Sequence, residues 1–115
     1  MIAGTGTPLR QFIYSEDLAI LILWSIENYS EIEPIILSVP ESEEKSINFV
    51  ATCIAKKFNY ENLIFDKEKP DGQFKKTANN SKLLARIQNF DFTPIEEGIS
   101  KTVEWFEANY KYSRR

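Results

Sequence analysis

The chain contains no histidine and only one cysteine among its 115 residues. The absence of histidine excludes imidazole acid-base catalysis, Ser-His and Cys-His nucleophile pairs and His-ligated metal sites within this chain. A lone cysteine, Cys53, cannot form an internal disulfide, which favours a reducing, cytoplasmic location. Because Cys53 lies in an apolar, helix-forming segment, we interpret it as a small buried hydrophobic residue without chemistry.

Long apolar runs and an excess of positive charge are also missing. The longest apolar run, Leu18 to Trp24, is well short of the ~20 residues that a membrane-spanning helix needs, so no membrane partner is expected. The 14 basic and 17 acidic residues give a net charge of -3, which argues against general nucleic-acid binding. The average composition and the length predict a single folded domain over residues 1–115.

Strand-like and helix-like segments alternate along the chain, as they do in α/β proteins. Polar and apolar residues alternate over 10–14, and apolar residues dominate 34–39 and 62–66, so we predict short strands at these three places. We predict four helices. The first two begin at Ser15 and Ser46, which are suitable N-caps, and the third begins at Asn80 or Ser81. The fourth begins at a capping box made of Thr93, Pro94 and Glu96. Residues 111–115 are expected to fray.

The first predicted helix is apolar on nearly all sides. Residues 18–26 contain few polar side chains, so this helix should be covered on more than one face. In a chain of this size, that pattern indicates a partner surface outside the chain.

The segment Gly4-Thr5-Gly6 superficially resembles a nucleotide-binding loop. A dinucleotide fingerprint needs a preceding strand, a third glycine three residues after the second, and a following helix. Position 9 is leucine, and we expect no strand before Gly4 within this chain. We therefore interpret the segment as a turn leading to Arg10.

Positive charge is concentrated in residues 67–86, which hold six basic residues and two acidic ones. The Pro70-Asp71-Gly72 turn would fold these cations over a strand-end crevice, where a diphosphate would accept charge-assisted hydrogen bonds. The alternative is a solvated basic surface loop. Elsewhere, no nucleophile triad, catalytic carboxylate pair or metal-ligand cluster has a convincing spacing.

An ordered series of short motifs resembles the C-terminal third of the GDP-L-fucose synthase family, which are extended short-chain dehydrogenase/reductases. The motifs are Gly4-Thr5-Gly6, Arg10-Gln11-Phe12, Asp17-Leu18-Ala19, Phe65-Asp66-Lys67, Pro70-Asp71-Gly72-Gln73-Phe74-Lys75-Lys76-Thr77, Asn80-Ser81-Lys82-Leu83, and Thr93-Pro94 with Trp105-Phe106.

The resemblance implies an α/β substrate-binding domain without the N-terminal Rossmann domain. Family members are homodimers that convert GDP-4-keto-6-deoxy-D-mannose to GDP-L-fucose, by epimerisation at C3 and C5 and reduction at C4 with NADPH. The glycine-rich cofactor loop, the Tyr-x-x-x-Lys pair and the epimerisation Cys and His belong to the family's N-terminal part. The resemblance thus implies an NADP-dependent epimerase-reductase as the parent enzyme, and a fragment without its catalytic residues.

The resemblance also implies which residues contact the GDP-sugar. Arg10 matches the family's substrate-contacting arginine, and Lys76 matches a motif lysine near the diphosphate. Asp71, Gly72 and Lys75 belong to the same loop and are further candidates for substrate binding. Ala3 stands where the family usually has tryptophan.

Two other functions are compatible with the sequence. One is the C-terminal domain of another nucleotide-sugar epimerase, dehydratase or reductase. The other is a non-catalytic binding or interaction module that uses the apolar helix at 18–26 as its interface.

Overall fold

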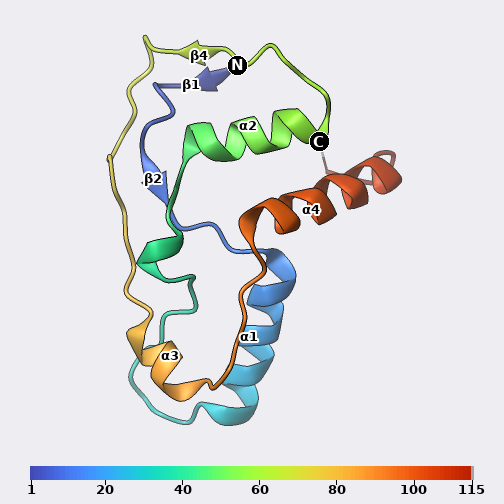
Figure 1. Cartoon of the computed structure of the whole chain (residues 1–115). Helices are drawn as coiled ribbons and strands as arrows, with labels where there is room; N and C mark the ends of the chain where they lie inside the picture. The colour runs from blue at the N-terminus through green and yellow to red at the C-terminus, as the bar shows by residue number, and fades with distance from the viewer. Residues whose placement is uncertain (115) are drawn as a thin grey trace.

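Helices make up most of the regular structure in the computed structural model, which describes residues 1–114. Within that range the helices are α1 (Ser15–Asn28), α2 (Ile47–Lys57), α3 (Ser81–Arg86) and α4 (Ile95–Asn109), with a 3-10 turn at Glu41–Glu43. The strands are β1 (Ile2–Ala3), β2 (Leu9–Arg10), β3 (Lys45–Ser46) and β4 (Phe65–Asp66). The molecule is elongated, with α1 and α3 at one end and β1 and β4 at the other (Figure 1).

The strands pair into two small ladders. β1 runs parallel to β4 with Ile2 opposite Phe65, and β2 runs antiparallel to β3 with Arg10 opposite Lys45. The mixture of helix and strand that the sequence predicts is confirmed, although each strand is only two residues long.

The predicted strand over 10–14 is wrong beyond Arg10. The side-chain amide nitrogen of Gln11 donates to the carbonyls of Val39 and Ala78, at 2.8 and 2.9 Å. Its amide oxygen accepts from the backbone N–H of Ala78 at 2.7 Å. Side-chain bonds to backbone therefore replace the ladder that the alternating pattern suggested.

The other two strand predictions fare differently. Residues 34–39 form no strand, because no segment within residues 1–114 pairs with them, although Val39 is buried. The strand predicted over 62–66 contracts to β4, where β1 supplies the partner. An apolar run becomes a strand only where a neighbour satisfies its backbone groups.

The helix starts show which capping signals hold. Ser46 caps α2 as predicted, and its hydroxyl accepts from the N–H of Phe49 at 3.0 Å. α1 begins at Ser15 as predicted, but its N-cap is Tyr14, and no side-chain capping bond forms there. The capping box predicted at Thr93 is wrong, because Pro94 holds the N-cap position of α4 without such a bond.

The buried carboxylate of Asp17 contacts Thr93, the residue before the N-cap of α4. It accepts from the N–H of Thr93 at 2.7 Å and from the Thr93 hydroxyl at 2.8 Å. Hydrogen bonds to a charged acceptor are stronger than those between neutral groups. The result is a contact that ties the start of α1 to the start of α4.

The apolar core is small and is drawn from all parts of the chain. Its buried aliphatic residues are Leu21, Val39, Ala55, Leu83 and Val103. Beside it, α2 and α4 pack against each other, with the rings of Phe58 and Phe106 edge to face at 6.2 Å (Figure 1). Cys53, which we expected to be buried, is half-buried in α2.

Helix α1 uses one face for this core and exposes another. Leu21 is fully buried, whereas Ile20, Leu23 and Ile26 are 52%, 61% and 75% exposed. No part of residues 1–114 covers this outer face.

Candidate functional site

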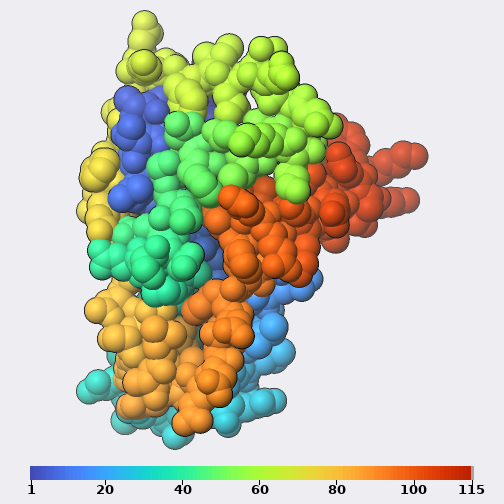
Figure 2. Space-filling view, in the orientation of Figure 1, coloured from blue at the N-terminus to red at the C-terminus, as the bar shows by residue number. Residues whose placement is uncertain are grey.

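Three segments that are distant in sequence meet around β2. The backbone N–H of Leu9 donates to the carbonyl of Phe74 at 2.8 Å, and Leu9 forms a parallel bridge with Lys75. We call residues 73–78 the strap. β3 lies on the other side of β2, so the strap and β3 flank it, and the strap runs along one edge of the molecule (Figure 2, yellow).

The turn at Gly4-Thr5-Gly6 fixes the loop that precedes the strap. Gly4 and Gly6 have φ angles of 82° and 77°, so the turn interpretation is confirmed. The expectation that no strand precedes Gly4 is wrong, because β1 ends at Ala3. The carboxylate of Asp71 accepts from the Thr5 N–H at 2.5 Å and the Thr5 hydroxyl at 2.7 Å. These hydrogen bonds lower the pKa of the Asp71 carboxyl below its ordinary value.

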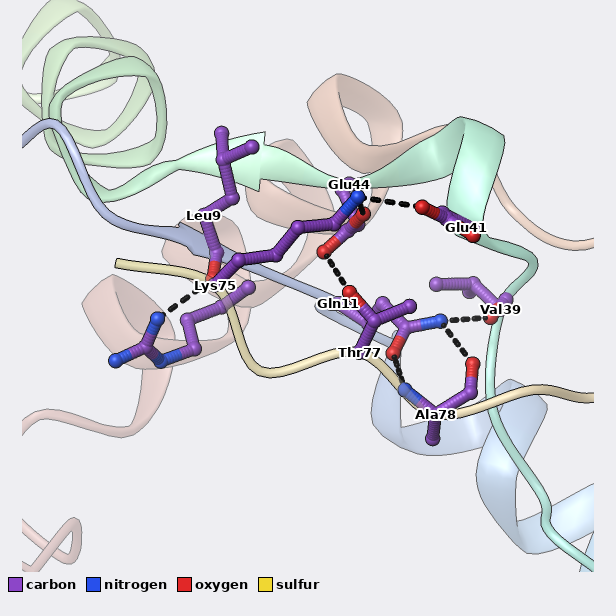
Figure 3. Close-up of polar contacts among 9 residues, drawn as sticks. Leu9, Gln11, Val39, Glu41, Glu44, Lys75, Thr77 and Ala78 are labelled. Atoms are coloured by element: carbon purple, nitrogen blue, oxygen red, sulfur yellow. Dashed lines mark hydrogen bonds and ion pairs between the residues drawn. The ribbon is translucent and has the colours of Figure 1, made fainter. Parts of the chain in front are cut away.

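Lys75 is engaged by two carboxylates from the other side of the site. Its ammonium group pairs with Glu41 and lies 3.2 Å from Glu44 Oε1 (Figure 3). The hydrogen bond to Glu41, followed by that to Glu44, raises the pKa of the Lys75 ammonium group above its ordinary value. Glu44 also accepts from the hydroxyl of Thr77 at 2.8 Å.

Arg10 lies half-buried between the strap and β3. Its guanidinium donates to the carbonyls of Leu9 and Gln73, at 2.6 and 2.8 Å. Carbonyl oxygens carry no formal charge, and no carboxylate among residues 1–114 pairs with this guanidinium. Its positive charge is therefore available to an anion.

Lys76 differs from its neighbour Lys75. Successive side chains in an extended segment point to opposite faces. Lys75 and Thr77 both contact Glu44, so Lys76 faces the other way. Since paired residues share a face and Leu9 is paired with Lys75, Arg10 and Lys76 lie on the same face. Lys76 is exposed and makes no hydrogen bond or ion pair with any described residue.

Gly72 sits just before the strap. Its φ angle is 72°, and a Cβ atom added there would meet nothing within 4 Å. The backbone is thus open at this point.

Two further cations of residues 67–86, Lys82 and Arg86, have partners away from this face. The Lys82 ammonium group donates to the hydroxyl of Tyr29 at 2.7 Å. Arg86 binds Glu31 through two bonds of 3.0 Å, which lower the pKa of the Glu31 carboxyl. Both contacts lie toward the α1–α3 end of the molecule (Figure 1). Of the cations predicted for the site, the pairing of Leu9 with Lys75 places Arg10 and Lys76 on one face, whereas Lys75 is held by Glu41 and Glu44.

Sequence reasoning missed the residues that hold the strap, which are Gln11, Glu41 and Glu44, and the cation opposite Arg10, which is Lys45. Their contacts join residues 28 or more positions apart. No local pattern signals such contacts.

A separate hollow of about 610 Å³ lies between the starts of α1 and α4 and the side of α2. Its lining is mainly apolar and includes Tyr14, Val39, Val50, Phe92 and Ile99, but neither Arg10 nor Lys76. The two free cations therefore belong to a different surface.

Within residues 1–114 there is no cluster of three or more Cys, Asp or Glu side chains arranged to hold a metal ion. None of the described helices has the length and apolar character needed to cross a membrane.

Comparison with known proteins gives the site a context. The chain is 49% identical over 115 residues to the GDP-L-fucose synthase of Dictyostelium discoideum and 46% identical to a probable GDP-L-fucose synthase of Drosophila melanogaster, covering 99% of this chain and 36% of each relative. A GDP-L-fucose synthetase from Naegleria fowleri bound to NADP superimposes with a TM-score of 0.95 at 48% identity, over 98% of this chain and 36% of that one. The chain matches the C-terminal third of GDP-L-fucose synthase. No family model matches the chain.

The likeness to GDP-L-fucose synthase confirms the resemblance based on the Arg10 and Pro70–Thr77 motifs. The chain spans about a third of the length of these relatives. A dTDP-glucose 4,6-dehydratase from Bacillus anthracis, at 17% identity, has a TM-score of 0.78 over 96% of this chain and 35% of that one. At that identity the likeness shows only that the two proteins share a fold over this region.

The cofactor of the Naegleria synthetase does not fit the residues present here. In a dinucleotide site, glycines permit close approach of a pyrophosphate. A Cβ atom on Gly4 would instead lie 2.3 Å from Asp71 Oδ1, and one on Gly6 would lie 2.5 Å from a Phe65 ring carbon. These glycines make room for the chain's own side chains, so residues 1–114 offer no NADP site at this turn.

Proposed function

We propose that this chain is the substrate-binding part of a GDP-L-fucose synthase and that Arg10 and Lys76 bind the diphosphate of the GDP-sugar. One observation carries the proposal. These two cations share a face of the strap, and neither has a carboxylate partner among residues 1–114. The 46–49% identity to GDP-L-fucose synthases supports the choice of ligand.

The two cations have complementary roles toward a diphosphate. The planar guanidinium of Arg10 offers paired donors, whereas the Lys76 ammonium group is a compact charge on a flexible stem. Each charge-assisted hydrogen bond contributes on the order of 1.5–3 kcal/mol. The neighbouring candidates Asp71, Gly72 and Lys75 shape the loop: Asp71 through Thr5, Lys75 through Glu41, and Gly72 by leaving room for the ligand.

The full-length protein in this proposal is a cytoplasmic, homodimeric, NADP-dependent epimerase-reductase. It converts GDP-4-keto-6-deoxy-D-mannose to GDP-L-fucose. The residues that bind the cofactor and those that react with the sugar lie in the part of the protein that this chain does not include. Alone, this chain would bind a GDP-sugar without turning it over.

Titration of the chain with GDP-L-fucose tests the binding role. We expect weak, saturable shifts of the backbone amide resonances of Arg10 and residues 72–77. Lys76→Met should weaken binding by about tenfold, equivalent to about 1.4 kcal/mol. The matched control is Lys69→Met, which removes an exposed cation of the same basic segment and should leave the affinity unchanged.

Three outcomes would contradict the proposal. If neither GDP-L-fucose nor a UDP-sugar moves any amide resonance, the chain is not a nucleotide-sugar-binding domain. Preference for a UDP- or dTDP-sugar would assign it to another nucleotide-sugar enzyme. Equal losses of affinity in the Lys76 and Lys69 variants would mean that the ligand is attracted by the overall positive charge of the segment and not by a specific site.

The outer face of α1 favours a second role, as a protein interface. Ile20, Leu23 and Ile26 are exposed on a helix whose opposite face reaches the core. The matched relatives are nearly three times as long as this chain, so we propose that their additional two thirds supply the surface that covers this face. Leu23→Gln should abolish association with a separately produced N-terminal part of a GDP-L-fucose synthase. Association that survives this change would place the interface elsewhere.

A further inference from the structure

We infer that Glu44 is a positioning residue that selects which of two adjacent lysines faces the ligand. The sequence places Lys75 and Lys76 side by side without distinguishing them. Glu44 holds Lys75 on its own side of the strap, and this directs Lys76 to the side of Arg10. The inference deepens the proposed function and rests on it for the identity of the ligand.

The first supporting observation is the burial of the Glu44 carboxylate. The Glu44 side chain is 6% exposed, compared with 63% for Glu41. A carboxylate removed from water is stable only when donors surround it. Both side-chain donors, the Lys75 ammonium group and the Thr77 hydroxyl, come from the strap.

The second observation is the spacing of these donors. Lys75 and Thr77 are two positions apart, which in an extended chain places both side chains on one face. One carboxylate therefore recognises an i, i+2 pair, and Figure 3 shows both contacts converging on Glu44. Lys76, between them, is forced to the opposite face.

The third observation concerns register. A slip of one residue in an extended segment moves every side chain to the other face. A slip here would exchange Lys75 and Lys76 and would remove Thr77 from Glu44. Gln11 stabilises the same register, because its amide group binds both the N–H and the carbonyl of Ala78.

A ligand-free experiment tests the register directly. In Glu44→Gln, we expect amide hydrogen exchange to accelerate by about tenfold at Leu9 and Ala78. The Leu9 N–H donates to the strap carbonyl of Phe74, and the Ala78 N–H of the strap donates to the Gln11 side chain. The Phe58 amide at the end of α2 should keep its protection. The matched control is Glu43→Gln, an exposed neighbour whose side chain has no hydrogen-bond or ion-pair partner among residues 1–114. Unchanged exchange at Leu9 and Ala78 would overturn the inference.

A double-mutant cycle with GDP as the probe tests whether Glu44 acts through Lys76. We expect Glu44→Gln to weaken GDP binding several-fold in the wild-type background and to have little further effect in Lys76→Met. Additive losses would mean that Glu44 does not act through Lys76. Thr77→Val, which keeps the Glu44–Lys75 ion pair, should weaken binding less than Glu44→Gln and provides the test if that variant does not fold.

The two experiments separate the possible failures. If the wild-type chain does not bind GDP, the proposed function fails, and the exchange rates still decide whether Glu44 sets the register. If GDP binds and Glu44→Gln changes neither exchange nor affinity, the function stands and the role of Glu44 is wrong.

Discussion

The strap and α1 are attached to the rest of the chain in opposite ways. Directional polar bonds to Glu44, Glu41 and Gln11 hold the strap. By contrast, α1 is held by a buried leucine and by the Asp17–Thr93 contact, and its outer face carries exposed isoleucine and leucine. Polar bonds specify one geometry, whereas apolar contact is roughly proportional to area and has no direction. The strap is therefore positioned by this chain alone, but the surroundings of α1 are incomplete.

The largest effect should come from the inner face of α1. Leu21 is fully buried, so Leu21→Ala should lower the free energy of unfolding by about 2–5 kcal/mol through lost burial and an added cavity. Denaturant unfolding of the chain measures this. A loss below about 1 kcal/mol would show that α1 is not anchored through this residue.

The polar anchor of α1 should contribute less than its leucine. Asp17→Ala removes the acceptor of two Thr93 donors, which should cost about 1–3 kcal/mol because two half-buried donors are left without partners. The control is Glu16→Gln, an exposed neighbour in the same helical turn. Equal unfolding midpoints for the two variants would show that Asp17 does not anchor α1.

Substitutions on the outer face of α1 should hardly change the stability of the isolated chain. Leu23→Gln and Ile26→Gln alter side chains that already contact water, so each should change the free energy of unfolding by less than about 0.5 kcal/mol. Denaturant unfolding again provides the measurement. A large loss of unfolding free energy from either substitution would mean that this face packs within the chain. The contrast between a fully positioned strap and an incompletely covered α1 would then be wrong.

The smallest effect is a local one, at the loop before the strap. The pKa of Asp71 is lowered in the folded state, so its contribution to stability is present above the unfolded value near 3.8 and is lost as the pH falls through the lower folded value. The Thr5 amide resonance should therefore shift in that acidic range. In Asp71→Asn the shift should disappear, and its persistence would assign it to another carboxyl group.

The features that the sequence predicted correctly depend on local signals. Ser46 caps α2 because its acceptor lies three residues from its donor. The turn at Gly4 and Gly6 was likewise readable from two glycines and their neighbours. The pairing of Arg10 with Lys76 as site residues came from motif resemblance rather than from charge alone, and their binding role stays a prediction.

The missed features depend on contacts between distant residues. Thr93 was expected to cap α4, but in the folded chain its N–H and hydroxyl donate to Asp17, 76 positions earlier. Residues 34–39 have a strand-like sequence, but no described strand lies beside them. Glu44 looked like one of several acids in a charged stretch, and only the folded chain reveals its partners on the strap.

The pairing of β1 with β4 has a practical consequence for protein production. The N–H of Ile2 donates to the carbonyl of Ile64 at 2.8 Å, beside the paired strands β1 and β4 (Figure 1). A dye attached beside Ile2 would crowd this ladder. A label placed after α4, beyond Asn109, keeps clear of both the ladder and the strap, and is the better choice for the titrations.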